Sequence, residues 1–146
     1  MRHWFCPAIL TLVVAVTAQG AGDPKAQSEL SKFDGTWQLV SAVTDGKPTP
    51  DDFVAKVRIT IRNGKHTVKI GDEIAVKEIP FTVDPTTVPK STIDTLPDGQ
   101  TIKGIYQLQG DTLTSCVARP GADRPTVFAS GPGSGHTLRV FKRVKD

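Results

Sequence analysis

Beyond residue 35, apolar and polar positions alternate with a period of two, the pattern of half-buried β-strands. In residues 56–62 (KVRITIR), Val57, Ile59 and Ile61 fall on one face, while Thr60 and the charged residues fall on the other. The pattern predicts eight main strands, at residues 36–44, 56–62, 65–70, 74–83, 90–96, 101–108, 112–118 and 137–144.

Short turn sequences separate most of these strands. Asn63-Gly64 lies between two alternating segments, and this dipeptide is typical of a tight β-hairpin. Within residues 74–83 the apolar side chains change parity at Lys77-Glu78, as they do where a β-bulge interrupts a strand. In the first strand, the positions expected to face inward run from Trp37 through Leu39 to Val43.

One segment of this region has the features of a helix start. Thr49 is a suitable N-cap, Pro50 fits the first helical position, and Asp51-Asp52 place negative charge where the helix dipole favours it. We therefore expect a short helical turn near residues 50–55, lying over one end of the sheet structure.

Eight strands joined in sequence order by short connections favour an antiparallel up-and-down topology. Closing such a sheet into a barrel removes its exposed edges. The expected fold class is therefore all-β, an eight-stranded antiparallel up-and-down barrel. The 146 residues predict a single domain, and 13 glycines and 11 prolines argue for many turns rather than a helix bundle.

The first residues have the organisation of a secretory signal peptide. A basic start containing Arg2 precedes an uncharged apolar run at Ala8–Val16, and small residues follow. We expect residues 1–20 to be the signal peptide, with cleavage after Gly20 (after Ala18 or Gly22 as alternatives). Residues 21–32 are expected to be a flexible leader that forms at most one helical turn, at Ala26–Lys32. The domain then covers residues 33–146, the protein is exported to the periplasm or the extracellular space, and the mature chain contains no membrane span.

Charge and cysteine usage narrow the possible partners. Removing Arg2 with the signal peptide takes the formal net charge from +3 to +2, and the basic residues are scattered, so we expect no nucleic-acid partner. Cys6 leaves with the same segment. Cys116 then has no partner for an internal disulfide, and we expect it to be a small buried strand residue.

Gly35-Thr36-Trp37, which opens the first strand, resembles the G-x-W motif of the lipocalin superfamily. In that superfamily the tryptophan closes one end of the barrel under a basic residue of the last strand, a role that Arg139 or Arg143 matches here. The runs GTWQLVSAVTDGKP, GIYQLQGDTLTSCVA and RPTVFASGPGSGHTLRVFKR are similar to a family of small exported lipocalin-like domains, abundant in planctomycete bacteria and of uncharacterised function. The resemblance covers residues 30–144 and implies a lipocalin-like barrel and export. The disulfide and C-terminal helix of many lipocalins have no counterpart here, so the resemblance implies no particular ligand.

The sequence contains no complete motif for catalysis or metal binding. His66 and His136 are far apart and lack metal-ligand spacing, so we expect no metal and no cofactor. His66 falls on an inward face, where we expect it to be hydrogen-bonded or to face the mouth of the barrel. Ser134 lies in a glycine-rich loop whose sequence departs from the nucleophile-elbow motif, so we expect the protein not to be an enzyme.

A barrel of eight strands can be filled by side chains or can hold one small ligand. We therefore expect a non-catalytic module that binds a small hydrophobic ligand, with Trp37, Ile59, Phe81 and Tyr106 in its wall. The alternative is a structural or protein-interaction domain of the cell envelope with a filled core and an unknown protein partner.

Overall fold

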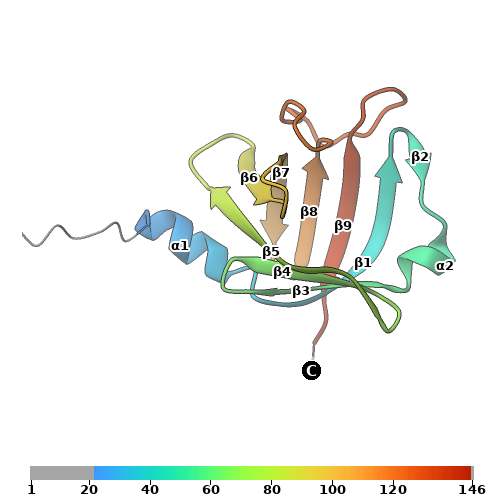
Figure 1. The fold of residues 1–146 in the computed structure, drawn as a ribbon, viewed down its shortest axis with the longest axis horizontal. Helices are drawn as coiled ribbons and strands as arrows, with labels where there is room; N and C mark the ends of the chain where they lie inside the picture. Colours follow the sequence, from blue (N-terminus) through green and yellow to red (C-terminus); the bar gives the residue numbers. More distant parts are fainter. Residues whose placement is uncertain (1–21, 146) are drawn as a thin grey trace, which may run out of the picture.

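The computed structural model describes residues 22–145, which form a closed barrel of eight antiparallel strands with a ninth short strand outside it and two helices (Figure 1). The helices are α1 (Pro24–Ser31) and α2 (Asp51–Val54). The strands are β1 (Gly35–Thr44), β2 (Lys47–Pro48), β3 (Val57–Arg62), β4 (Lys65–Ile70), β5 (Glu73–Asp84), β6 (Lys90–Thr95), β7 (Thr101–Gln109), β8 (Thr112–Val117) and β9 (Thr137–Arg143). The expected signal peptide, residues 1–20, lies outside the described residues.

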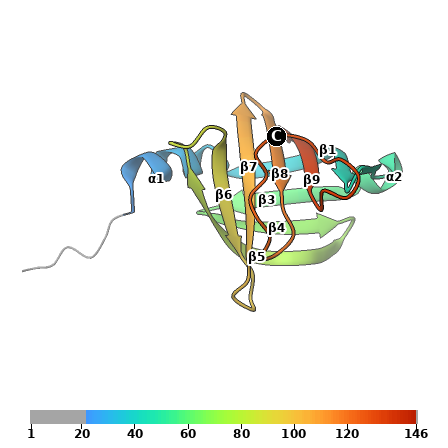
Figure 2. The same cartoon turned by 90° about the horizontal axis from the view of Figure 1, so that it is seen from above.

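Strands β3 to β9 pair with their neighbours in chain order, and β1 pairs with both β3 and β9. The β1–β9 ladder, from Trp37 opposite Arg143 to Thr44 opposite Thr137, closes the barrel. Strand β2 pairs only with β1 and stays outside. Figures 1 and 2 show β3–β5 crossing the direction of β7–β9, so the barrel is flattened into two crossing layers. The eight-stranded up-and-down barrel expected from the sequence is thus confirmed.

The predicted hairpin and bulge are both present. Asn63 and Gly64 have φ of 50° and 73°, the left-handed backbone that a two-residue hairpin turn requires. The register between β4 and β5 shifts at Lys77-Glu78, where Glu78 also has a positive φ and its N–H donates to Thr67 Oγ1 at 3.1 Å. The bulge returns the later half of β5 to the parity that faces the barrel interior.

Two local expectations need correction. Strand β1 contains an unforeseen irregularity between Leu39 and Ser41, so Ala42, which is 8% exposed, is buried in place of Val43. Helix α2 lies in the expected range, but Pro50 is its N-cap and Thr49 is not. The Thr49 N–H donates instead to the Ala42 carbonyl at 2.8 Å, which ties the loop to β1.

The segment expected to be a flexible leader contains α1. Asp23 caps this helix by accepting a hydrogen bond from the Lys25 N–H at 3.0 Å. Eight residues are too few for a stable isolated helix, so its order depends on contacts with the barrel. These contacts are made by Leu30, which packs against the core, and by Glu29, whose carboxylate lies within the protein.

Helix α1 covers one end of the barrel, which we call the closed end and define by α1, Phe33, Trp37, Tyr106 and Arg143. Trp37 is fully buried there, and its Nε1–H donates to the Phe33 carbonyl at 2.8 Å. The Phe33 ring packs edge-on against Tyr106 with centroids 5.0 Å apart. The opposite, mouth end is formed by strand termini such as Thr44 and Thr137. No helix in the described part of the chain has the length and hydropathy needed to cross a membrane.

Candidate functional site

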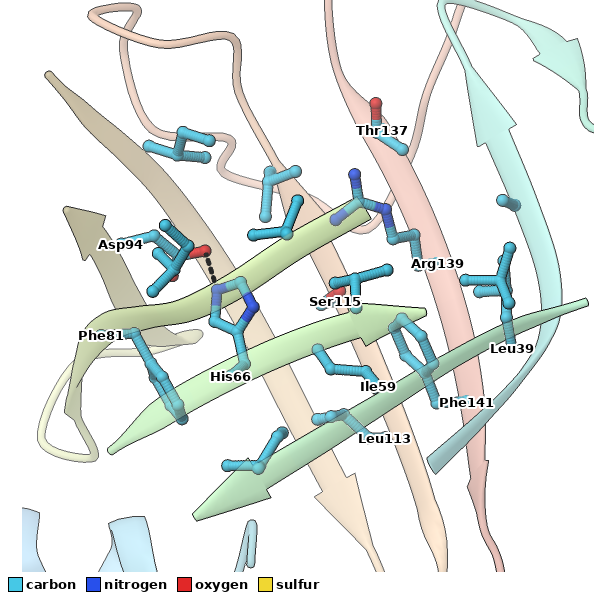
Figure 3. A pocket seen from close by; sticks show the side chains of 18 of the residues that line it. Leu39, Ile59, His66, Phe81, Asp94, Leu113, Ser115, Thr137, Arg139 and Phe141 are labelled. Atoms are coloured by element: carbon cyan, nitrogen blue, oxygen red, sulfur yellow. Dashed lines mark hydrogen bonds and ion pairs between the residues drawn. The ribbon is translucent and has the colours of Figure 1, made fainter. Parts of the chain in front are cut away.

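A cavity of about 460 Å³ occupies the barrel between the closed end and the mouth end (Figure 3). Most of its lining is aliphatic or aromatic, and it includes Leu39, Ala42, Val57, Ile59, Ile61, Val68, Ile70, Val76, Ile79, Phe81, Leu96, Ile102, Leu113, Val117 and Phe141. Helix α2 adds Phe53, which is 43% exposed at the mouth end. The interior is therefore packed at the closed end and contains the cavity between that end and the mouth end.

The space has a local cause in the pairing of strands β7, β8, β9 and β1. Tyr106, Ser115, Arg139 and Ala42 lie opposite one another in successive ladders and form one row across the interior. Arg139 thus stands between two small side chains. A leucine or phenylalanine in place of Ser115 or Ala42 would fill the row. The small side chains that are present leave volume around the guanidinium.

Three of the four residues expected in a ligand site border this cavity, namely Ile59, Phe81 and Tyr106. Tyr106 contributes its ring, because its hydroxyl donates to Glu29 Oε1 at 3.0 Å in the closed end. The structure places Trp37 elsewhere. It is not among the cavity residues and lies buried under Arg143, so its expected place in the wall is corrected to the closed end.

His66 on β4 and Asp94 on β6 form a polar pair within the apolar lining. His66 Nε2 lies 3.1 Å from Asp94 Oδ2, which confirms that this inward histidine is hydrogen-bonded. His66 Nδ1 is buried and has no hydrogen-bond partner in residues 22–145. The tautomer with hydrogen on Nε2 fits this geometry, because it donates to the carboxylate and leaves no N–H unsatisfied on Nδ1.

The two arginines of β9 that could match the lipocalin-like stack are separated by the structure. The Arg143 guanidinium lies 4.2 Å from the Trp37 ring centroid and donates to the Asp34 and Lys32 carbonyls at 2.6 and 2.8 Å. Arg143 therefore closes the barrel under the tryptophan. Arg139, four residues earlier on the same face of β9, extends into the cavity instead (Figure 3).

Arg139 makes no hydrogen bond or ion pair within residues 22–145. Desolvation by burial lowers the pKa of its guanidinium, and the negative charge of Asp94 partly opposes this effect. Arginine nevertheless keeps its proton in proteins. The cavity thus contains a permanent cation that has no hydrogen-bond or ion-pair partner in the part of the chain that the structure describes.

Other groups with potential chemistry are accounted for by local structure. Buried Cys116 donates from Sγ to the Ala129 carbonyl at 3.4 Å, and burial raises the pKa of its thiol, so it fits the expected strand residue. Ser134 Oγ accepts from the His136 N–H at 3.2 Å within their loop. In the part of the chain that the structure describes, no three His, Cys, Asp or Glu residues are grouped to hold a metal ion.

Asp94 and Arg139 line the cavity, although no sequence motif marks either of them as a site residue. Their only sequence signal is parity, since each shares the inward face of its strand with an apolar cavity residue. No protein-family model, curated protein or solved structure matches the chain.

Proposed function

We propose that this protein is an exported, non-catalytic binding module that holds one small apolar molecule inside its barrel. The observation that carries the proposal is the cavity of about 460 Å³. This volume falls within the range of roughly 300–1,000 Å³ that is typical of small-molecule sites. The mainly aliphatic and aromatic lining supports an apolar ligand, because burying apolar surface is the main driving force for binding such a molecule.

The division of the barrel interior supports the same function. The rings of Phe33, Trp37 and Tyr106 pack the closed end, so the fold has an aromatic core that does not depend on filling the cavity. Phe53 of α2 borders the cavity at the mouth end. A rigid floor, an apolar wall and a rim residue on a short helix suit a small molecule that inserts from the mouth end.

Two measurements on the purified protein test the proposal. N-phenyl-1-naphthylamine, an uncharged dye that fluoresces in apolar surroundings, should bind with 1:1 stoichiometry. Native mass spectrometry of the exported protein should show loss of the first 18, 20 or 22 residues and a bound small molecule. An unoccupied mass together with no dye binding would contradict the proposal and favour a structural or interaction domain.

A further inference from the structure

Three of the arginines in residues 22–145 are partly buried, and they differ sharply in what they contact. Arg124 donates to the carbonyls of Thr92 and Gly104, both at 2.6 Å. Arg143 donates to two carbonyls and lies 3.3 Å from the Asp111 carboxylate. Arg139 lacks any such contact within the described residues, although it lines the mainly apolar cavity.

Arg139 is half-buried, and its guanidinium has no protein acceptor within residues 22–145, so the water lost from its buried side is not replaced by protein groups. The neighbouring residues of its cross-strand row, Ser115 and Ala42, are too short to satisfy its five N–H donors. Asp94 is the one acid among the cavity residues, and it is hydrogen-bonded to His66 rather than to Arg139. The fold thus maintains a forked donor that faces open volume.

We infer that the ligand is an amphiphile whose anionic headgroup, of the carboxylate or sulfonate type, pairs with the Arg139 guanidinium while its apolar part lies along the cavity wall. This inference rests on the proposed function and specifies the chemical class of its ligand. A guanidinium fork matches a carboxylate in two parallel hydrogen bonds, so the pairing fixes orientation as well as charge.

The position of Arg139 sets the direction in which the ligand lies. A smaller cavity of about 220 Å³ adjoins the main one at the mouth end, and Arg139, Asp94 and Thr137 border both. Exposed Arg119 also lines the smaller cavity. The headgroup therefore lies near the junction of the two cavities, and the apolar part extends toward Phe81, deeper in the barrel.

A pair of dyes with the same ring system tests the charge requirement. 1-Anilinonaphthalene-8-sulfonate carries a sulfonate, whereas N-phenyl-1-naphthylamine carries none. Arg139→Met keeps an unbranched apolar stem at this position and removes the charged guanidinium. We expect this variant to bind the sulfonate dye at least about tenfold more weakly, since hydrogen bonds to charged groups contribute that much. Its affinity for the uncharged dye should change by less than about twofold.

Two controls separate the cavity cation from general surface charge and from misfolding. Arg62→Gln removes an exposed arginine outside the cavity and should leave both affinities unchanged. Retained binding of the uncharged dye shows that Arg139→Met is folded. Decanoate should also displace the uncharged dye from the unmodified protein more effectively than decanol, and Arg139→Met should abolish that preference.

The possible outcomes distinguish this inference from the function on which it rests. If neither dye binds the unmodified protein, the proposed function itself is wrong. If both dyes bind and Arg139→Met leaves sulfonate binding intact, or weakens both dyes equally, the cavity binds apolar molecules without an anion site and this inference alone is overturned.

Discussion

Glu29 is a buried carboxylate that connects α1 to the barrel. It accepts hydrogen bonds from Lys32 Nζ at 2.8 Å, Lys90 Nζ at 2.7 Å and Tyr106 Oη at 3.0 Å. Burial acts to raise the pKa of Glu29, but the hydrogen bonds from Lys32, Lys90 and Tyr106 and the charge of Lys90 outweigh it and lower the pKa from 4.5 to about 2. The ionised form is therefore the one that the fold stabilises.

The direction of this pKa shift sets the pH at which the contact stabilises the protein. Because the folded-state pKa is depressed, the contribution of Glu29 is complete above about pH 4.5 and disappears as the pH falls through about 2. Glu29→Gln should lower the free energy of unfolding by about 2–3 kcal/mol at pH 7. Urea unfolding should show that Glu29→Gln is less stable than the unmodified protein at pH 7 but not at pH 2.

Glu73 is the matched control for this change, because it is exposed and makes no ion pair within the described residues. Glu73→Gln should leave the urea midpoint nearly unchanged at both pH values. An equal loss of stability in the two variants, or a Glu29→Gln effect that persists at pH 2, would contradict the assigned role of the carboxylate.

At the residue scale, the sequence predicts which face a strand residue presents but not what it contacts. Arg139 and Arg143 have the same parity on β9, so either could lie over Trp37. The choice depends on the β1–β9 register, which sets Trp37 opposite Arg143, and this pairing joins segments about a hundred residues apart. The same long-range register places Arg139 beside Ser115 and leaves it without a protein partner.

At the scale of elements, Gly104 shows how closely β6, β7 and β8 approach one another. A Cβ atom at this position would lie 2.8 Å from Val117 Cγ1, 2.9 Å from Thr92 Oγ1 and 3.0 Å from the Cys116 carbonyl. These distances are shorter than the contacts that a Cβ atom makes in a packed protein interior. The glycine therefore permits the strand packing that also brings its carbonyl to the Arg124 guanidinium.

Gly104→Ala should consequently destabilise the protein by overpacking, by about 1–3 kcal/mol. Differential scanning calorimetry or urea unfolding measures the loss. Gly131→Ala is the control, because a Cβ there meets no atom within 4 Å, and its effect should stay within about 0.5 kcal/mol. Equal stability of the two variants would show that the sheet adjusts around Gly104 without cost.

Elements whose pattern is local are the ones that the sequence predicts well. The hairpin at Asn63-Gly64 and the bulge at Lys77-Glu78 follow from turn chemistry and parity, and both are present. Helix α1 is different, since its short polar sequence shows little helical pattern and its order depends on Glu29 and Leu30 meeting the barrel. The irregularity in β1 lies between Leu39 and Ser41. Because Ala42 and Val43 beyond it are both apolar, the sequence does not show which of them faces inward.

At the scale of the whole molecule, strand number and closure follow from the sequence, whereas an interior cavity does not. The inward positions of each strand are mostly apolar when read one strand at a time. Only the ladders that join β7, β8, β9 and β1 show that Ser115 and Ala42 flank the same long side chain, Arg139. Side-chain volume summed across strands decides whether a barrel is filled. That sum requires the register of every ladder at once.

Changing the volume of one row should therefore change binding without harming the fold. Ser115→Leu adds an apolar side chain to the cavity wall, and cavity filling commonly stabilises proteins by about 0.5–2 kcal/mol. The variant should keep or raise the unfolding temperature and should bind N-phenyl-1-naphthylamine at least about tenfold more weakly, because the leucine occupies ligand space. Thermal unfolding and dye titration on the same sample measure both effects.

Thr114→Leu makes the corresponding addition to the same strand on the opposite face, outside the cavity. Because a strand residue and its neighbour point to opposite faces, this variant should retain dye affinity within about twofold. If both leucine variants bind the dye equally well, the dye occupies a site other than the barrel interior. A loss confined to Ser115→Leu would place the ligand in the row that contains Arg139, where an apolar wall and an unpaired cation meet.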